Sequence, residues 1–304
     1  MLNIGLVGLG VIARAQHLPA IAANPSMRLA AIASRNAVLD GLPSYPDVAA
    51  LLAAEPEISA ISLCTPPQGR FDQAMAVLRA GRHLMLEKPP GATLSEVEAL
   101  QREAQAQGVT IFASWHSREA AAVDPARDWL SDKALKSIAI EWFEDVRKWH
   151  PGQDWIWAAG GLGVFDPGIN ALSILTKLIS DVVLERADLH IPQGRATPIA
   201  ADLRLKAGDV PITAAFDWRY ERDELWRITF ETDQGTLLLE DGGARMSVNA
   251  TPLTSGENHE YARLYARFHD LIKAKQSEVD LAPLRLVADA FLTGQHHPTD
   301  PFHP

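Results

Sequence analysis

The sequence predicts an α/β protein of two domains, the first built on a parallel sheet and the second an α+β domain with an open, mostly antiparallel sheet. Its 304 residues suffice for two domains of ordinary size. Strand-like and helix-like segments alternate from Leu2 to Ala113, which is typical of repeated βα units. Period-two runs dominate between Ser137 and Glu240 and indicate antiparallel strands. We therefore expect domains at residues 1–118 and 119–304.

Composition excludes several classes of protein. The apolar fraction of 47%, the charged fraction of 22% and the net charge of −10 describe a soluble globular chain. It has no Lys/Arg run that could follow a phosphate backbone, so nucleic acid is not an expected partner. No apolar stretch approaches the roughly 20 residues of a membrane span, so no membrane partner is expected. Cys64 is the single cysteine, which fits a reducing compartment, and we expect a cytoplasmic protein.

A glycine-rich turn follows the first predicted strand, Leu2 to Val7. The turn reads Gly8-Leu9-Gly10-Val11-Ile12-Ala13, and the apolar spacing then becomes helical. The first glycine permits a tight turn, the second lets backbone N–H groups approach a pyrophosphate, and the small alanine lets the helix pack on the strand. A plain strand-to-helix turn is the alternative. In this context we predict dinucleotide-binding residues at Gly8, Gly10, Val11 and Ile12.

The second predicted strand ends in Ser34 and Arg35, where an NAD site would place an acidic residue on the ribose 2′-hydroxyl. Neither residue is a carboxylate. Ser34 can donate to a phosphate, and Arg35 can pair with it or stack on adenine. The sequence therefore favours NADP, with NAD as a second acceptable cofactor. The alternative for Arg35 is an ordinary solvated side chain.

Polar residues follow three later predicted strands, at Thr65-Pro66, at Glu87-Lys88-Pro89 and at His116. Ligands of parallel sheets bind at the carboxyl ends of the strands. A lysine there, beside a cofactor that becomes positively charged on oxidation, can hydrogen-bond a substrate oxygen. A cis peptide bond at Pro89 would aim it at the ligand; the alternative is an ordinary loop lysine. The expected cofactor contacts at these strand ends are Thr65, Pro66, Glu87 and Lys88.

A segment rich in aromatic residues and glycines precedes a core helix, and we interpret it as an active site. Trp149, His150 and further tryptophans lie in a stretch with too many glycines for a regular element. The helix that follows carries Asp166 and Asn170, which share a face because they are one turn apart. Asp166 precedes Pro167, which equally suits a helix N-cap, so the sequence alone leaves a structural role for Asp166 open.

Together these motifs resemble the Gfo/Idh/MocA oxidoreductase family. The resemblance covers essentially the whole chain and rests on Gly8 to Ala13, Glu87-Lys88-Pro89 and Gly161 to Asp166, in the family's order and spacing. It implies an N-terminal Rossmann domain and a C-terminal α+β domain. Many members have a histidine four residues after the helix aspartate, where this chain has Asn170. Because asparagine cannot shuttle a proton, acid/base chemistry should fall to Asp166 or Lys88.

A closer resemblance is to the branch of that family that oxidises L-arabinose and D-galactose. It rests on Glu144, Trp149 to Gln153, Met85 to Thr93, Trp115 to Ser117 and Phe165 to Asn170. It implies oxidation of an aldopyranose (L-arabinose, D-galactose or D-fucose) at the anomeric carbon. Hydride would pass to the nicotinamide and the product would be an aldonolactone.

The resemblance also implies roles for single residues. Asp166 is the expected base, Lys88 polarises or deprotonates the same oxygen, and Asn170 orients it; the opposite assignment, with Lys88 as base, stays open. Polar groups that read sugar hydroxyls and aromatic faces that receive the C–H side of a pyranose complete the site. Trp226 has the alternative of a core or interface tryptophan. The expected substrate contacts are Glu144, His150, Trp149, His116 and Trp226.

Two alternative functions stay open: another sugar or inositol dehydrogenase of the same family, and a non-catalytic NADP-binding sensor. A sensor would not need Lys88 and Asp166. The second face of the antiparallel sheet could meet another copy, so we expect a homo-oligomer. Three C-terminal histidines, His296, His297 and His303, are loosely spaced beside prolines, and we interpret them as a surface tail and not as a metal site.

Overall fold

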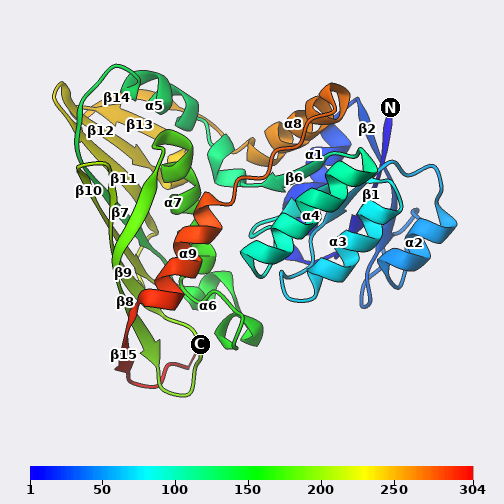
Figure 1. Cartoon of the computed structure of the whole chain (residues 1–304), viewed down its shortest axis with the longest axis horizontal. Coiled ribbons are helices and arrows are strands. Elements are labelled where there is room, and N and C mark those ends of the chain that lie inside the picture. Colours follow the sequence, from blue (N-terminus) through cyan, green and yellow to red (C-terminus); the bar gives the residue numbers. More distant parts are fainter. Residues whose placement is uncertain (304) are drawn as a thin grey trace. The chain divides into compact units, whose positions relative to one another are not determined.

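The computed structural model describes residues 1–303 and divides into two compact units. Unit 1 comprises Met1–His116 and Glu260–Leu281, and unit 2 comprises Ser117–His259 and the residues from Ala282 onward (Figure 1). The first boundary lies two residues before the expected one. The second half of the chain differs from the expectation, because Glu260–Leu281 belongs to unit 1 and interrupts unit 2 in the sequence.

The described part of unit 1 contains a six-stranded sheet in which every neighbouring pair of strands is parallel. This confirms the predicted parallel sheet. The strand order reverses beside β1, which is the point where such sheets bind dinucleotides at the carboxyl ends of their strands. In spatial order the strands are β3 (Ser44–Tyr45), β2 (Met27–Ala33), β1 (Leu2–Val7), β4 (Ala60–Leu63), β5 (His83–Glu87) and β6 (Ile111–Ser114).

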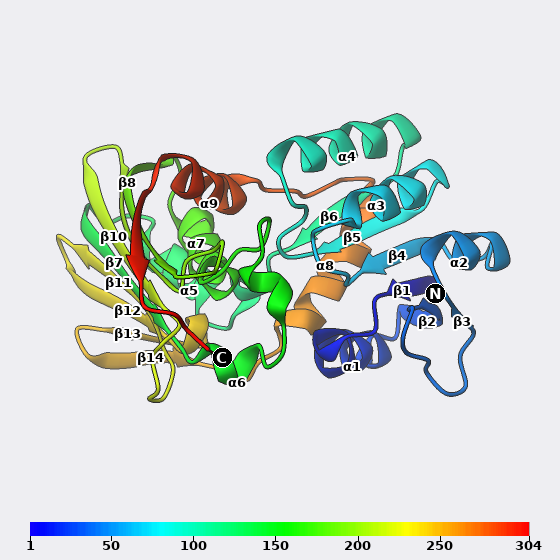
Figure 2. The ribbon, with the colours of Figure 1, turned by 90° about the horizontal axis from the view of Figure 1, so that it is seen from below.

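Helices cover both faces of this sheet. Helices α2 (Val48–Ala54), α3 (Arg70–Arg79) and α4 (Leu94–Gln107) bury their apolar residues in one cluster with the strands. The π-helix η1 (Ala13–His17), α1 (Leu18–Ala23) and α8 (Glu260–Ala274) share the other cluster (Figure 2).

The assignment of α8 to unit 1 has a simple cause. Its apolar side shares one buried cluster with the sheet residues Ile4 and Leu6, and Phe268 stacks on Phe112 of β6 with ring centroids 6.0 Å apart. Burying each large apolar side chain contributes roughly 1.5 to 3 kcal/mol. The apolar side of α8 consists of Tyr261, Leu264, Tyr265, Phe268 and Leu271. Periodicity predicts such a helix, but it does not show on which sheet the helix packs.

The described part of unit 2 contains a nine-stranded sheet. Neighbouring strands are antiparallel except for the pairs β7/β10 and β8/β15, so the expectation of an open, mostly antiparallel sheet is confirmed. In spatial order the strands are β14 (Thr251–Ser255), β13 (Arg245–Val248), β12 (Gly235–Glu240), β11 (Leu225–Thr232), β7 (Leu135–Phe143), β10 (Val210–Asp217), β9 (Ala200–Ala207), β8 (Val182–Pro192) and β15 (Gln295–Thr299).

The expectation of a C-terminal surface tail is wrong for His296 and His297, which lie in β15. This strand pairs in parallel with β8. Without β15, the backbone groups on that side of β8 would be unpaired. His297 Nε2 lies 2.8 Å from Asp188 Oδ1, and its ring stacks on His190 at 5.3 Å. His303 follows β15 and is exposed.

Helices α7 (Phe165–Leu178) and α9 (Ala282–Thr293) pack together on one face of the nine-stranded sheet (Figures 1 and 2). Shorter helices, α5 (Val123–Leu130) and α6 (Val146–Trp149), and the 3₁₀ turns η2 (His116–Glu119), η3 (Asp154–Trp157) and η4 (Asp241–Gly243) complete the described fold. The alternation in β7 fits one covered face, because Ile138, Ile140 and Trp142 are buried and their neighbours are half-buried. None of the helices within residues 1–303 has the length and apolarity of a membrane span.

Candidate active site

The glycine turn after β1 has the geometry that a dinucleotide needs. Gly8 has a φ of +92°, and a Cβ there would lie 2.9 Å from the backbone N of Thr65, so only glycine fits. At Gly10 an added Cβ would meet no described atom within 4 Å. Val11 and Ile12 are 76% and 51% exposed although both are apolar. The turn therefore leaves open backbone at the start of a helix, which fits a pyrophosphate.

The structure places Ser34 and Arg35 beside this turn. Val7 and Ala33 are partners in the β1/β2 ladder, and Gly8 N donates to Ala33 O at 2.9 Å, so the chain after β2 leaves the sheet next to the glycines. Ser34 is half-buried and Arg35 is exposed. This is the arrangement expected for residues that contact the ribose end of a dinucleotide.

A buried arginine joins the loops after β4 and β5. Arg70 is 2% exposed and donates to the backbone carbonyls of Thr65, Glu87 and Pro89, with an Nε to Thr65 O distance of 2.8 Å. Burial lowers the pKa of Arg70 to about 10, with Glu87 opposing the change, so it stays protonated at neutral pH. No sequence pattern indicated this role, because a charged residue that opens a helix normally lies at the surface. Pro66 is exposed in the same turn.

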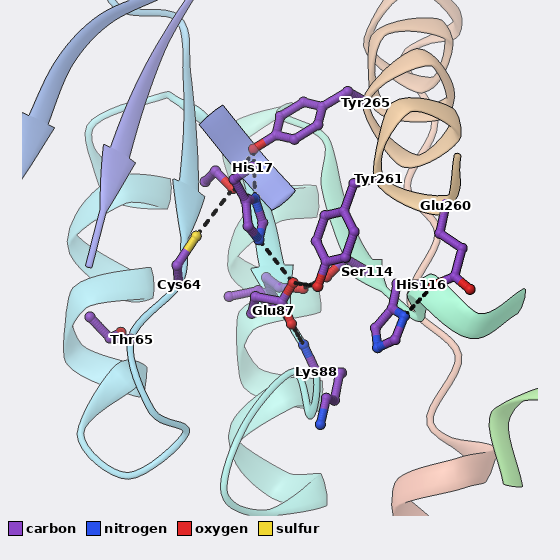
Figure 3. Close-up of polar contacts among 12 residues, drawn as sticks. His17, Cys64, Thr65, Glu87, Lys88, Ser114, His116, Glu260, Tyr261 and Tyr265 are labelled. Atoms are coloured by element: carbon purple, nitrogen blue, oxygen red, sulfur yellow. Dashed lines mark hydrogen bonds and ion pairs between the residues drawn. The ribbon is translucent and has the colours of Figure 1, made fainter. Parts of the chain in front are cut away.

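Glu87, which we expected to contact the cofactor, faces a buried network (Figure 3). Its Oε1 lies 2.9 Å from His17 Nε2 and accepts from Tyr261 Oη at 2.8 Å, and its Oε2 accepts from the backbone N of Lys88 at 2.8 Å. Burial alone would raise the pKa of Glu87, but the hydrogen bond and charge of His17, with smaller effects of His116 and Tyr261, lower it to about 2. The peptide bond between Lys88 and Pro89 is cis, the arrangement that the sequence left open.

The hydrogen bonds of the network indicate a protonated His17. Tyr265 Oη donates to Ser62 Oγ at 3.1 Å, so it accepts from His17 Nδ1 at 2.8 Å, while Nε2 donates to Glu87. Burial alone would lower the pKa of His17, but Cys64, Tyr265 and Glu87 together raise it well above its ordinary value. A buried ion pair between His17 and Glu87 results. No sequence pattern singled out His17 or the two tyrosines, Tyr261 and Tyr265.

His116 is held within unit 1. Its Nδ1 lies 2.5 Å from Glu260 Oε2, and its ring stacks on Tyr261 with centroids 5.5 Å apart (Figure 3). The expected substrate contact therefore stands next to the network around Glu87, and α8 supplies both of its neighbours.

In unit 2, the glycine segment brings the chain tightly into α7. Gly163 has a φ of +54°, and a Cβ there would lie 2.4 Å from Pro198 O. The N-cap of α7 is Val164, without a side-chain cap, and the helix begins at Phe165. The alternative that Asp166 is an N-cap is therefore wrong. Asp166 lies within the first turn and is only 8% exposed, a burial that a capping role does not explain.

The structure brings His150 to Asp166. His150 follows α6, and its Nε2 lies 3.4 Å from Asp166 Oδ2, while its Nδ1 lies 3.3 Å from Gln153 Oε1. Asn170, one turn after Asp166 on α7, is half-buried. The segment between α6 and α7 thus folds back so that an imidazole faces the first turn of the helix.

Two indoles hold the buried carboxylate of Glu144, which follows β7 and is 3% exposed. Trp218 Nε1 donates to its Oε1 at 3.1 Å, and Trp226 Nε1 donates to its Oε2 at 3.0 Å. These bonds offset the cost of burying the charge. The sequence did not single out Trp218; its only signal was a tryptophan at the end of a predicted strand.

Aromatic contacts join these residues into one group. Trp218 lies 5.2 Å from the ring of His150, and Trp226 lies 5.9 Å from Trp149, which is 45% exposed. Trp226 also stacks on Trp142 at 5.8 Å, so the expectation of a core tryptophan holds for one of its faces. We call the group the acid–aromatic cluster; its members are Glu144, Trp149, His150, Asp166, Trp218 and Trp226.

Comparisons with known proteins agree with this architecture. Residues 2–114 match the model of an oxidoreductase family with an NAD-binding Rossmann fold, named Gfo/Idh/MocA. Galactose 1-dehydrogenase from Pseudomonas fluorescens is 43% identical over 304 residues, which cover 99% of each chain. The crystal structure of a D-galactose-1-dehydrogenase protein from Rhizobium etli has 50% identity and a TM-score of 0.96, over 99% of this chain and 98% of that one.

More distant structures share the fold. A 3-ketoreductase from Actinomadura kijaniata, solved in complex with NADP and TDP-benzene, has a TM-score of 0.85 at 18% identity, over 98% of this chain and 99% of that one.

Proposed function

Because the chain belongs to the Gfo/Idh/MocA oxidoreductase family, we propose that it oxidises an aldopyranose at the anomeric carbon to the aldonolactone, with NADP as the preferred cofactor. The observation that carries the proposal is the acid–aromatic cluster, in which Asp166 and Glu144 lie among aromatic rings. Full-length similarity to two galactose 1-dehydrogenases supports D-galactose as a substrate. L-Arabinose and D-fucose share its ring configuration up to the fourth carbon, and we propose them as further substrates.

The reaction needs a hydride acceptor and a base. The nicotinamide, when bound, accepts the hydride from the anomeric carbon. Asp166 takes the proton of the hydroxyl on that carbon, and Lys88 hydrogen-bonds the same oxygen. Asn170 orients this oxygen and does not act as a base, because an amide transfers no proton at neutral pH. His150, beside Asp166, holds the carboxylate in place.

Substrate selection falls to the rest of the acid–aromatic cluster and to His116. Exposed Trp149 offers an aromatic face to the C–H side of the ring, and Trp226 forms a further wall. Glu144 accepts hydrogen bonds from sugar hydroxyls, and His150 accepts or donates them. A sugar that lacks or inverts one of these hydroxyls leaves a buried polar group without its partner, which costs binding energy.

Ser34 and Arg35 support the preference for NADP. They follow β2 beside the glycine turn, and neither carries the carboxylate that repels a 2′-phosphate and binds a 2′-hydroxyl. An arginine there can pair with the phosphate.

Initial rates of cofactor reduction at 340 nm test the proposal, with NADP and NAD each offered with D-galactose, L-arabinose, D-fucose, D-xylose and D-glucose. We expect turnover of the first three sugars and formation of a lactone, detected by its reaction with hydroxylamine. Asp166→Asn and Lys88→Met should each lower kcat by at least about 100-fold.

Asp154→Asn is the matched control, because Asp154 has an 88% exposed side chain in η3 and the substitution is the same. It should keep the wild-type rate. Turnover of an inositol in place of these sugars would favour the other family activities. Tight NADP binding with no turnover of any polyol, unchanged in Lys88→Met, would favour a sensor.

A homo-oligomer formed through the second face of the nine-stranded sheet is part of the same proposal. Alternate residues of β9 on that face, Asp202, Arg204 and Lys206, are exposed and charged. Light scattering coupled to size-exclusion chromatography gives the mass in solution, and a monomer at micromolar concentration would remove this part of the proposal.

A further inference from the structure

We propose that a buried frame in unit 1, made of His17, Arg70, Glu87 and Tyr261, positions Lys88 for the reaction. The inference rests on the proposed function, in which Lys88 hydrogen-bonds the reacting oxygen. It adds residues that act only through Lys88 and are therefore positioning residues. Lys88 itself lies directly after β5, at the carboxyl end of the strand.

The frame holds Lys88 from its N-terminal side through Glu87. The backbone N of Lys88 donates to Glu87 Oε2 at 2.8 Å (Figure 3). The other oxygen, Oε1, is held at 2.9 Å by His17 and at 2.8 Å by Tyr261. Glu87 is 7% exposed, so a rotation of its carboxylate would break three hydrogen bonds in a medium of low dielectric constant.

The frame holds Lys88 from both flanks through Arg70. One nitrogen of its guanidinium, Nη1, donates to the carbonyls of Glu87 and Pro89, the residues on either side of Lys88. The same side chain also binds Thr65 O, in the neighbouring loop after β4. Because the guanidinium is planar and rigid, it fixes these carbonyls relative to one another in a way that a flexible ammonium cannot.

The members of the frame come from four separate elements. Glu87 ends β5, Arg70 opens α3, Tyr261 lies in the first turn of α8, and His17 ends η1, the helix that follows the glycine turn. The fold thus ties the helix nearest the cofactor's phosphates to the peptide that carries Lys88. Glu87 contributes one negative charge, which His17 balances directly, while the buried guanidinium of Arg70 is satisfied by backbone carbonyls.

Anchoring of the peptide matters because the lysine side chain has four rotatable bonds of its own. Misplacing a reacting group by about 1 Å costs on the order of 100-fold in rate, and loss of groups that orient catalytic residues typically costs 10- to 100-fold. The cost appears in kcat, because the side chains of the frame are buried within unit 1 and act on Lys88 through its backbone and that of its neighbours. A purely structural role would instead lower the melting temperature and leave kcat of the folded fraction unchanged.

The test compares Glu87→Gln and Tyr261→Phe with Ser114→Ala in the 340 nm assay. Ser114 is buried at the end of the adjacent strand β6, and its Oγ donates to Leu86 O at 2.9 Å, so Ser114→Ala removes one buried hydrogen bond near Lys88 without touching the frame. We expect kcat to fall about 10- to 100-fold in Glu87→Gln and less in Tyr261→Phe. The KM for NADP should stay within about 2-fold in both, and Ser114→Ala should keep wild-type kcat.

Lys88→Met separates this inference from the proposed function. If Glu87 acts through Lys88, Glu87→Gln should lower the residual rate of Lys88→Met no further, as a double-mutant cycle measures. Wild-type kcat in Lys88→Met would remove the role of Lys88 itself. Loss of kcat in Lys88→Met with full kcat in folded Glu87→Gln and Tyr261→Phe would overturn the positioning role alone. An equal loss of kcat in Ser114→Ala would overturn it as well. Tyr261→Phe keeps the test decisive if Glu87→Gln does not fold.

Discussion

The imidazole of His150 faces the carboxylate of Asp166, with Nε2 3.4 Å from Oδ2. The two residues come from different elements, since His150 follows α6 and Asp166 lies in the first turn of α7. Asn170 stands where the family resemblance leads one to expect a histidine. In this chain an imidazole reaches the aspartate from another segment.

This contact predicts that His150 contributes to turnover through Asp166. We expect His150→Asn to lower kcat about 10-fold, because the carboxylate loses a neighbour that orients it, and Asp166→Asn to lower it at least about 100-fold. Steady-state rates with D-galactose and NADP measure both. His190→Asn, in β8 of the nine-stranded sheet, is the control. A full rate in His150→Asn would leave the contact without a catalytic consequence.

The hydrogen bonds of Glu144 predict that replacing one of its carboxylate oxygens by an amide group lowers the stability of the protein. Both of its oxygens accept indole N–H groups, so the amide of Glu144→Gln would point its NH₂ group at Trp218 or Trp226. A buried donor facing another donor costs about 1 to 3 kcal/mol of unfolding free energy. Urea denaturation measures the loss. Glu185→Gln, whose carboxylate is exposed on β8 and paired with Lys206, should change stability little, and an equal loss there would contradict the prediction.

Substitution of the two glycines in the turn after β1 should affect different properties, stability for Gly8 and cofactor affinity for Gly10. Gly8→Ala puts a Cβ at a φ of +92° and 2.9 Å from Thr65 N, so we expect a loss of stability of at least about 1 to 2 kcal/mol. Gly10→Ala meets no described atom within 4 Å, so the free protein should keep its stability while the methyl group occupies space that a pyrophosphate needs. NADPH fluorescence titration should show a Kd at least about 10-fold higher. Unchanged NADPH affinity in Gly10→Ala would argue against a pyrophosphate at this turn.

The position of Arg35 predicts that this residue determines the preference for NADP over NAD. We expect Arg35→Ala to raise the KM for NADP about 10-fold, because a charge-assisted hydrogen bond to the 2′-phosphate is lost, and to leave the KM for NAD almost unchanged. Rates over a range of each cofactor give both values. Arg28→Ala is the control, because Arg28 is exposed near the other end of β2. Equal effects on both cofactors would place Arg35 away from the 2′-phosphate.

The pair of His17 and Glu87 makes stability depend on pH in both directions. The pKa of Glu87 is lowered from 4.5 to about 2, so its contribution to unfolding free energy is complete above pH 4.5 and is lost as pH falls toward 2. The pKa of His17 is raised above 6.5, so its contribution is complete below pH 6.5 and is lost as pH rises through the higher value. The difference in stability between wild type and His17→Gln should therefore be largest between pH 4.5 and 6.5.

Urea denaturation at several pH values checks this prediction. His297→Gln, which removes a more exposed histidine paired with Asp188, serves as the control. A difference between wild type and His17→Gln that is the same at every pH would show that His17 is neutral in the folded protein.

The sequence by itself determined the features that depend on neighbouring residues. Alternating strands and helices predicted the parallel sheet, the spacing of Gly8 and Gly10 predicted the turn after β1, and the one-turn spacing of Asp166 and Asn170 placed them on one helix. Periodicity, turn geometry and helix spacing are local properties, so a few consecutive residues suffice to define them.

Only the tertiary structure decided which distant segments meet. It placed α8 in unit 1, paired His17 with Glu87 across 70 residues, and closed Trp218 and Trp226 on Glu144 across 74 and 82 residues. It also excluded the N-cap role of Asp166, because the helix begins one residue earlier and the segment carrying His150 folds back on it. Such contacts arise from the burial of apolar faces and from the pairing of polar groups that burial encloses. Both depend on the whole topology, which no local pattern encodes.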